Sequence, residues 1–165
     1  MKELTITIPV KSFKKFDNPY DSIAMAAKYQ FITELYQRTG VSVARNPQAW
    51  QNFLASACRN YKCRFDEQLL IFAQRPDAVA VAELETWNRE FKRWVNKDSR
   101  GIAVFDPKGR RNTLKYYFDV SDTHEGYYGS RPVPIWQMNE RYEQAVTERL
   151  TDRFGERPGG GVAPV

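Results

Sequence analysis

The sequence predicts an α+β fold in which about five helices pack on a small, mainly antiparallel β-sheet with one clear hairpin. Several segments repeat apolar residues at helical spacing, and others alternate apolar with polar residues or are rich in β-forming residues. A strong turn signal, Asp106-Pro107-Lys108-Gly109, separates two of the β-rich segments. At 165 residues the chain suits one domain, which we expect over residues 1–154, followed by a flexible tail over residues 155–165.

The N-terminal part of the chain is predicted to form one strand and one helix. Residues 4–8 alternate apolar and polar side chains as a half-buried strand does, and Pro9 ends the pattern. After a connector, apolar residues recur on one stripe from Ile23 to about Arg38. We therefore expect a helix there, with Gly40 as its stop signal.

The next two helices have clear boundary signals. Asn46 is a strong N-cap, and Pro47 suits the first helical position, where no backbone donor is needed. An apolar stripe follows at helical spacing: Trp50, Phe53, Leu54, Ala57 and Tyr61. A further helix over residues 65–74 is expected to end before Pro76.

The second half of the chain is predicted to alternate strands with helices. Residues 78–82 suit a short strand, and residues 102–105 and 113–120 suit the two strands of the hairpin. Residues 96–100 suit a turn and residues 121–134 a loop. Two more apolar stripes at helical spacing predict the last two helices. The first contains Leu84, Trp87, Phe91 and Trp94. The second contains Ile135, Met138, Tyr142, Val146 and Leu150, and its helix extends to about Phe154.

Composition argues for a protein without a membrane segment, a metal or a cofactor. No clean apolar run is longer than that of residues 69–73, far below the roughly 20 residues of a membrane span. The N-terminus lacks the features of a signal peptide, so we expect a cytoplasmic location. Cys58, Cys63 and the single His124 cannot complete a four-ligand zinc site. We expect both cysteines to be small buried residues, although their spacing would also allow a disulfide.

No pattern of enzyme chemistry occurs in the sequence. There is no HExxH, GxGxxG, phosphate loop or Gly-x-Ser-x-Gly motif, and a lone loop histidine such as His124 is usually a surface residue. The three glycines at 159–161 have no strand before them and no helix after them, so they form no phosphate cradle. The sequence therefore predicts a binding protein with no catalytic residues.

The positive charge is concentrated in one segment. Residues 89–115 hold nine basic and three acidic residues, whereas the rest of the chain holds 16 basic and 17 acidic residues. A solvated surface would explain such a run, but its concentration favours a polyanionic partner. We predict that seven side chains contact phosphates: Arg93, Lys97, Arg100, Lys108, Arg110, Arg111 and Lys115.

Aromatic residues add a second feature of nucleic-acid binding. Tyr61 and Tyr116 are expected to stack on bases, and Arg59 and Lys62 to extend the phosphate track. Tyr116 and Tyr117 point to opposite faces of a strand, so only one of them can be buried. The tryptophans at 50, 87 and 94 lie on helical stripes and are expected to pack in the core.

One segment also resembles a known family. It is similar to the N-terminal domain of the ArdC antirestriction and LtrC-like proteins of plasmids and conjugative elements. The resemblance covers about residues 46–122. It is carried by Asn46-Pro47-x-x-Trp50, Phe53-Leu54, Phe65, Gln68-Leu69-Leu70-Ile71, Ala73-Gln74-Arg75-Pro76-Asp77-Ala78, Trp87, Trp94-Val95, Gly101-Ile102-Ala103 and Tyr117-Phe118-Asp119-Val120.

The resemblance implies single-stranded DNA binding in the service of mobile DNA. Two departures stand out: the family's Lys-Gly-x-Lys-Gly turn is here replaced by residues 96–101, Asn-Lys-Asp-Ser-Arg-Gly, and the HExxH motif of the metalloprotease-like domain of full ArdC proteins does not occur. We expect a single-stranded DNA-binding protein, with RNA as another ligand, acting in antirestriction or anti-CRISPR counter-defence. The alternatives are an inhibitor that docks directly on a CRISPR or restriction nuclease, and a scaffold module of a larger polypeptide.

Overall fold

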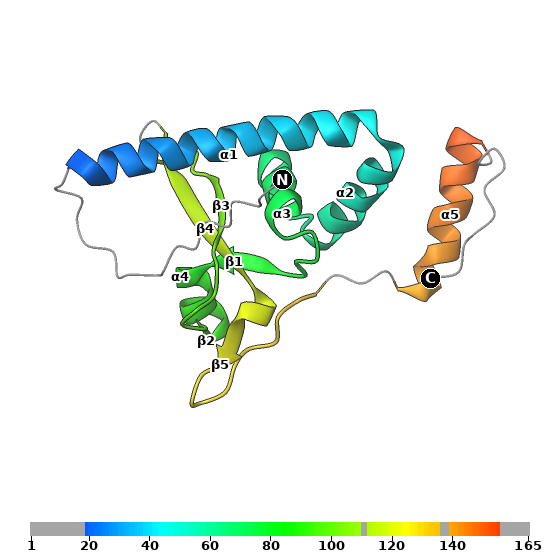
Figure 1. The fold of residues 1–165 in the computed structure, drawn as a ribbon. Helices are drawn as coiled ribbons and strands as arrows, with labels where there is room; N and C mark the ends of the chain where they lie inside the picture. The colour runs from blue at the N-terminus through cyan, green and yellow to red at the C-terminus, as the bar shows by residue number, and fades with distance from the viewer. Residues whose placement is uncertain (1–18, 110–111, 136–138, 156–165) are drawn as a thin grey trace. The chain divides into compact units, whose positions relative to one another are not determined.

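The structure, a computed structural model, describes residues 19–109, 112–135 and 139–155 (Figure 1). It confirms the predicted α+β class: its helices accompany a three-stranded and a two-stranded antiparallel sheet. The chain divides into two compact units, Met1–Ile135 and Trp136–Val165. The predicted strand at residues 4–8 and nearly all of the predicted tail lie outside the described residues, and the single-domain organisation stays a prediction.

The first unit begins with a helix that is longer than the sequence predicted. Helix α1 (Pro19–Arg45) continues through Gly40, although a glycine inside a helix costs about 1 kcal/mol relative to alanine. Packing explains the continuation, because Val43 in the last turn is buried in a cluster with Phe53 and Leu69. The expected stop at Gly40 is therefore wrong, and residues 41–43 belong to the helix.

Helix α2 (Pro47–Arg59) begins where the Asn46-Pro47 signal predicted, and helix α3 (Phe65–Gln74) has both of its predicted boundaries. The Asn46 side chain accepts hydrogen bonds from the backbone N–H groups of Gln48 and Ala49, at 2.9 and 3.3 Å. Because α2 ends at Arg59, Tyr61 lies in the following turn and not on the helix. Figure 1 shows that α1 lies across α3 and that α2 turns back from the C-terminal end of α1.

The three-stranded sheet has the order β1-β4-β3 and contains the predicted hairpin. Strand β3 (Ile102–Phe105) pairs with β4 (Leu114–Asp119), placing Ile102 opposite Tyr117. Strand β1 (Val81–Glu83) starts three residues later than predicted and pairs with the other edge of β4. The Gln74 amide in α3 bonds both backbone groups of Ala103, at 2.8 and 3.0 Å, and so ties the helix to β3.

The predicted helix from Leu84 to Trp94 is wrong in its second half. A single turn, α4 (Leu84–Thr86), leads into a π-helical turn, η1 (Trp87–Phe91), and Lys92 then adopts a left-handed conformation with φ of 56°. The chain reverses there and enters β2 (Arg93–Val95). Trp94 therefore lies on a strand, because pairing with a distant strand overrides the helical spacing.

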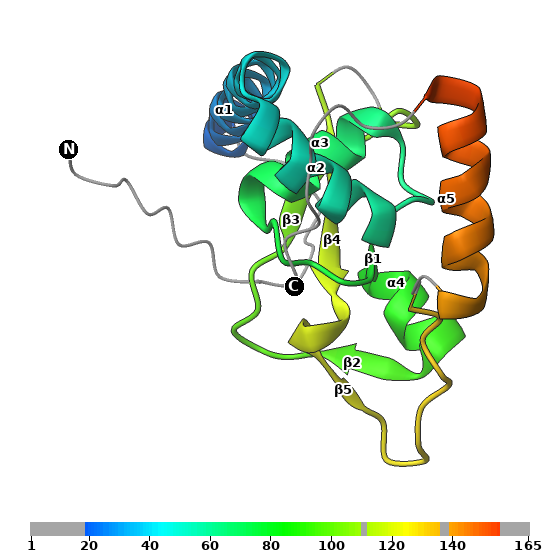
Figure 2. The same ribbon diagram turned by 90° about the vertical axis from the view of Figure 1, so that its right-hand side faces the viewer.

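The segment predicted to be a loop supplies that distant strand. A 3-10 turn, η2 (Val120–Asp122), is followed by β5 (Thr123–Glu125), which pairs with β2 and places Trp94 opposite His124. Figures 1 and 2 show this two-stranded ladder at the end of the first unit opposite α1. The main core lies between them and contains Ile32, Leu70, Ile71, Ala78, Ile102, Ala103, Val104 and Leu114.

The second unit contains helix α5 (Glu140–Phe154). The Asn139 side chain caps it by accepting a hydrogen bond of 2.9 Å from the backbone N–H of Arg141. Tyr142, Val146 and Leu150 lie on this helix as predicted, whereas Ile135 precedes it. Met138 lies outside the described residues. In the described part of the chain, no helix has the length and apolarity that crossing a membrane requires.

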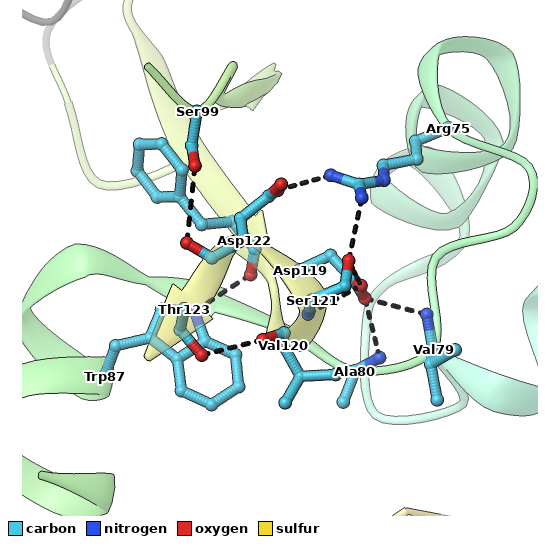
Figure 3. Close-up of polar contacts among 11 residues, drawn as sticks. Arg75, Val79, Ala80, Trp87, Ser99, Asp119, Val120, Ser121, Asp122 and Thr123 are labelled. Atoms are coloured by element: carbon cyan, nitrogen blue, oxygen red, sulfur yellow. Dashed lines mark hydrogen bonds and ion pairs between the residues drawn. The ribbon is translucent and has the colours of Figure 1, made fainter. Parts of the chain in front are cut away.

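A buried carboxylate joins β1, β4 and η2 in the first unit (Figure 3). Asp119 is 2% exposed and accepts hydrogen bonds from the backbone N–H groups of Val79 and Ala80, at 2.7 and 3.0 Å. It also accepts bonds from the backbone and hydroxyl of Ser121, at 3.1 and 2.6 Å. Burial alone would raise the pKa of Asp119, but these bonds outweigh it, and the pKa lies below its ordinary value.

We predict that Asp119→Asn destabilises the protein by about 1–3 kcal/mol at pH 6, because the amide cannot accept all four hydrogen bonds. Because the pKa of Asp119 is depressed in the folded state, its carboxylate stabilises the fold above the unfolded pKa of about 3.9. This stabilisation is lost as pH falls through the pKa that Asp119 has in the folded state. The gap between wild type and variant should therefore narrow below about pH 4. Urea unfolding at several pH values measures it, with Asp77→Asn, an exposed aspartate, as control. Equal stability at pH 6 would contradict the role assigned to Asp119.

Candidate nucleic-acid interface

Two of the predicted phosphate-binding arginines are engaged with the protein itself. The Arg59 guanidinium donates to the backbone carbonyls of Ala78 and Pro76, at 3.0 and 2.5 Å. The Arg93 guanidinium donates to the hydroxyl and carbonyl oxygens of Thr123, at 2.7 and 3.1 Å, and only 16% of its side chain is exposed. Both side chains hold loops or strands in place, and their contact with nucleic acid stays a prediction.

Lys115 is also held inside the first unit. Its Nζ lies 2.8 Å from the Glu67 carboxylate, 3.5 Å from that of Glu83 and 2.5 Å from the Tyr117 hydroxyl. Glu67 is 4% exposed, and its other oxygen accepts a 2.9 Å bond from the backbone N–H of Arg64 at the start of α3. Lys115 therefore compensates a buried acid that begins a helix.

The pKa values around this ion pair follow from burial and charge. Burial alone would raise the pKa of Glu67, but the bonds from Lys115 and the Arg64 backbone lower it. Burial opposes a charged Lys115, yet its bonds to Glu67 and Tyr117 raise its pKa. Burial raises the pKa of Tyr117 to about 12 and, with Glu67 nearby, that of Cys63 to about 11. All four groups thus keep one protonation state near neutral pH.

Other cations of the basic segment face solvent. Lys92, Lys97, Arg100 and Lys108 are exposed, and none of them forms an ion pair with another described residue. Arg110 and Arg111 lie outside the described residues. These four exposed side chains are the described cations of the segment that are free to meet an anionic ligand.

Lys97 and Arg100 lie together at an open depression of about 520 Å³ in the loop between β2 and β3. Arg93, Lys108 and Lys115 do not line it. Three cations and two acids form its charged lining, giving a net charge of +1. The lining consists of Arg75, Asn96, Lys97, Asp98, Ser99, Arg100 and Asp122.

The segment around η2 fixes the shape of this loop (Figure 3). The Asp122 carbonyl accepts bonds from the Asn96 backbone and the Ser99 hydroxyl, at 2.8 and 3.3 Å. The Asp122 carboxylate pairs with Arg75, whose other nitrogen donates to the Ser121 hydroxyl at 2.8 Å. Gly101 closes the loop, where an added Cβ would lie 3.1 Å from Tyr116.

The predicted stacking residues differ in accessibility. Tyr61 is 57% exposed, with the ammonium group of Lys62 5.7 Å from its ring centre. Tyr116 is half-buried, and Lys28 of α1 lies 4.5 Å from its ring centre. Tyr117 is half-buried as well, so neither ring is fully buried, which is compatible with the prediction that only one of the two tyrosines can be buried. Lys28 of helix α1 thus contacts Tyr116, and Glu67 of helix α3 accepts a hydrogen bond from the Tyr117 hydroxyl.

The tryptophan predictions are partly wrong. Trp87 is 1% exposed, as predicted, and donates a 2.9 Å hydrogen bond to the Phe118 carbonyl. Trp50 and Trp94 are 44% and 48% exposed, because α2 turns Trp50 outward and the β2 strand does the same for Trp94. Two further exposed rings, Tyr127 and Tyr128, lie in the segment predicted to be a loop and had no predicted role.

The described residues contain no cluster of His, Cys, Asp or Glu that would hold a metal ion. Both cysteines are free thiols, and Cys58 is exposed on α2, so its predicted burial is wrong. Cys63 is half-buried. His124 is exposed and its Nδ1 lies 2.7 Å from the Asn96 side-chain oxygen.

Comparisons with protein-family models, curated proteins and solved structures find no match to this chain. The resemblance to the ArdC N-terminal domain therefore stays an expectation from the sequence.

We predict that Lys115→Met lowers the free energy of unfolding by about 2–4 kcal/mol, because it leaves the buried Glu67 without its main partner. Chemical denaturation measures the loss. Lys108→Met, which removes an exposed lysine, should change stability by less than about 0.5 kcal/mol. A Lys115 variant as stable as the Lys108 variant would show that Lys115 is available for ligand instead.

Proposed function

We propose that this protein binds single-stranded nucleic acid, in the first place DNA, as a counter-defence protein of a mobile genetic element. One observation carries the binding proposal: Lys97 and Arg100 are exposed on one anchored loop, beside Arg75 and an open depression. The exposed Trp94 lies on the strand that leads into this loop. Cations next to an open aromatic ring are what a single strand requires.

The electrostatics support a polyanion as the ligand. Each phosphate neutralised by a lysine or arginine releases counterions, so affinity falls as salt rises. The loop backbone is fixed by the bonds to Asp122, so the two loop cations are presented by a rigid segment. The backbone that carries Lys97 and Arg100 therefore loses less conformational entropy on binding than the backbone of a flexible tail would.

The open form of the depression favours a single strand over a duplex. A shallow, irregular surface is followed more easily by a flexible single strand, whose unpaired bases are free to stack on aromatic side chains. RNA and DNA share these features, and comparison of the two belongs to the test below.

The counter-defence role comes from the sequence resemblance. In the ArdC-like pattern a basic turn precedes the Gly-Ile strand, and Lys97 and Arg100 lie in the corresponding loop here. A protein with a net charge of +5 is a poor mimic of DNA, so an acidic decoy mechanism does not apply. Coating the incoming strand, or competing for a guide RNA, would both use the basic loop.

A second candidate function is direct inhibition of a CRISPR or restriction nuclease by protein–protein contact. The observation that favours it is a group of exposed apolar residues on α2 and α3: Trp50, Leu54 and Phe65, at 44%, 42% and 57% exposure. The buried Phe53 joins two of them, with ring centres 5.7 Å from each of Trp50 and Phe65. Exposed aromatic groups of this kind are typical of protein interfaces.

We predict that the double variant Lys97→Glu/Arg100→Glu weakens binding to a labelled single strand of about 20 nucleotides by about tenfold or more at 50 mM salt. The log–log salt slope should become shallower by about 1.4, since two phosphate contacts are lost. Fluorescence anisotropy from 50 to 300 mM salt, with duplex and RNA alongside, measures both quantities.

The charge-matched control is Arg38→Glu/Arg45→Glu, which changes two exposed arginines of α1 by the same total charge. Equal weakening by both variants would show that net charge, and not the loop, controls binding. Absence of wild-type binding at 50 mM salt would reject the proposal, and salt-insensitive binding to a nuclease would favour the second candidate.

A further inference from the structure

The β2–β5 ladder has one inward and one outward face. Arg93 and Thr123 belong to the inward face, where they bond each other. Trp94 and His124 are opposite one another in the register and belong to the outward face. Asn96, two residues after Trp94, reaches His124 across this face, at 2.7 Å. Alternation along the strand thus directs the Trp94 indole to solvent.

A glycine keeps the indole in its position. A Cβ added at Gly126 would lie 2.8 Å from the Trp94 indole nitrogen and 3.2 Å from the Lys92 carbonyl, so any side chain there would force a shift. The Gly126 backbone donates a 3.2 Å bond to that same carbonyl. The indole therefore lies against the chain just after β5, yet remains 48% exposed.

The loop that follows presents two more rings. Tyr127 and Tyr128 are 95% and 97% exposed, and their ring centres lie 5.1 Å apart in an edge-to-face arrangement. A turn holds them, with Gly129 at φ of 85° and its backbone bonded to the Gly126 carbonyl at 2.9 Å. Both rings are therefore open to a ligand, and tyrosine, with an apolar ring and a polar hydroxyl, is suited to binding faces.

The loop is anchored at its far end as well. The backbone N–H of Arg131 donates a 2.8 Å bond to the Phe91 carbonyl, and the Arg93 guanidinium lies 3.3 Å from the Ser130 hydroxyl. We refer to β2, β5 and residues 126–131 together as the aromatic ladder. Its three exposed rings lie on a segment with fixed ends, so little order has to be gained when a ligand binds.

Charge identifies the kind of ligand. The exposed Lys92 precedes β2, the exposed Arg131 ends the loop, and Lys97 follows β2 by two residues. Glu125, the one acidic residue in the sequence of the aromatic ladder, lies 3.6 Å from Arg93 and is thereby compensated. Flat rings framed by free cations complement a chain of anionic groups that carries flat apolar rings, as a single-stranded nucleic acid does.

We propose that the aromatic ladder is the base-stacking part of the nucleic-acid site, with Trp94, Tyr127 and Tyr128 contacting unpaired bases. The loop cations Lys97 and Arg100 hold the adjoining phosphates. This inference rests on the proposed function and assigns stacking to residues other than Tyr61 and Tyr116. The rings act on the bases and the cations on the phosphates, so the two groups contact separate parts of the ligand.

The test uses the full chain and two variants that remove rings, Tyr127→Ser/Tyr128→Ser and Trp94→Leu. Each should weaken binding to a labelled oligonucleotide of about 20 thymidines by about tenfold or more, with an unchanged salt slope, because no cation is lost. The matched variants Tyr127→Phe/Tyr128→Phe and Trp94→Phe keep the rings and should bind nearly as wild type does. Circular dichroism confirms that all variants fold.

A second ligand separates stacking from phosphate contact. An abasic strand of the same length should bind more weakly than the thymidine strand, and wild type and ring-removing variants should bind it equally. Oligonucleotide should also quench tryptophan fluorescence in wild type, with a clear loss of that quenching in Trp94→Phe.

Wild-type affinity for the thymidine strand in the ring-removing variants would overturn this inference and leave the proposed function intact. No binding by wild type at 50 mM salt would overturn both. Binding through the rings to anionic lipid vesicles or to a nuclease, without any response to oligonucleotide, would also overturn the inference.

Discussion

One buried carboxylate supports the part of the fold on which the candidate site depends. Asp119 ends the central strand β4 and accepts bonds from Val79, Ala80 and Ser121, which brings the start of β1 and the η2 turn together (Figure 3). A backbone bond of 2.9 Å from Val120 to the Ala80 carbonyl adds to this junction. The turn determines where β5 begins, and β5 in turn pairs with β2. Both the basic loop and the aromatic ladder therefore depend on the Asp119 carboxylate, which is not itself part of the candidate site.

The basic residues of the chain divide into two groups with different physical roles. Arg59, Arg93 and Lys115 satisfy carbonyl groups or a buried acid, and a buried charge needs such partners to be tolerated. Lys97 and Arg100 have no ion-pair partner among the described residues and stay hydrated at an open surface. Net charge in a sequence segment therefore overstates the charge available to a ligand, since part of it is consumed by the fold.

Local signals predicted the elements that local interactions determine. The Asn46-Pro47 cap, the stop before Pro76 and the turn at residues 106–109 fix α2, α3 and the β3–β4 hairpin within a few residues of chain. The errors lie where distant contacts decide. Packing of Val43 overrides Gly40, and the pairing of β2 with β5 overrides the helical spacing of Trp94. The Glu67 partner of Lys115 and the Thr123 partner of Arg93 are likewise about 30 to 50 residues away, so these contacts could not be predicted from the sequence.

The change in direction at Lys92 shows how this fold makes a surface residue from one that the pattern assigns to the core. Trp87 and Trp94 are seven residues apart and would share one face of a continuous helix. A π-helical turn and a left-handed Lys92, which costs roughly 1 kcal/mol or more for a residue with a Cβ, interrupt that helix. Trp87 stays buried, whereas Trp94 emerges on the exposed face of the ladder. Lys92 is the C-cap of the π-helical turn, where a left-handed residue commonly ends a helix, so this one conformation both ends the turn and directs Trp94 away from the core that holds Trp87.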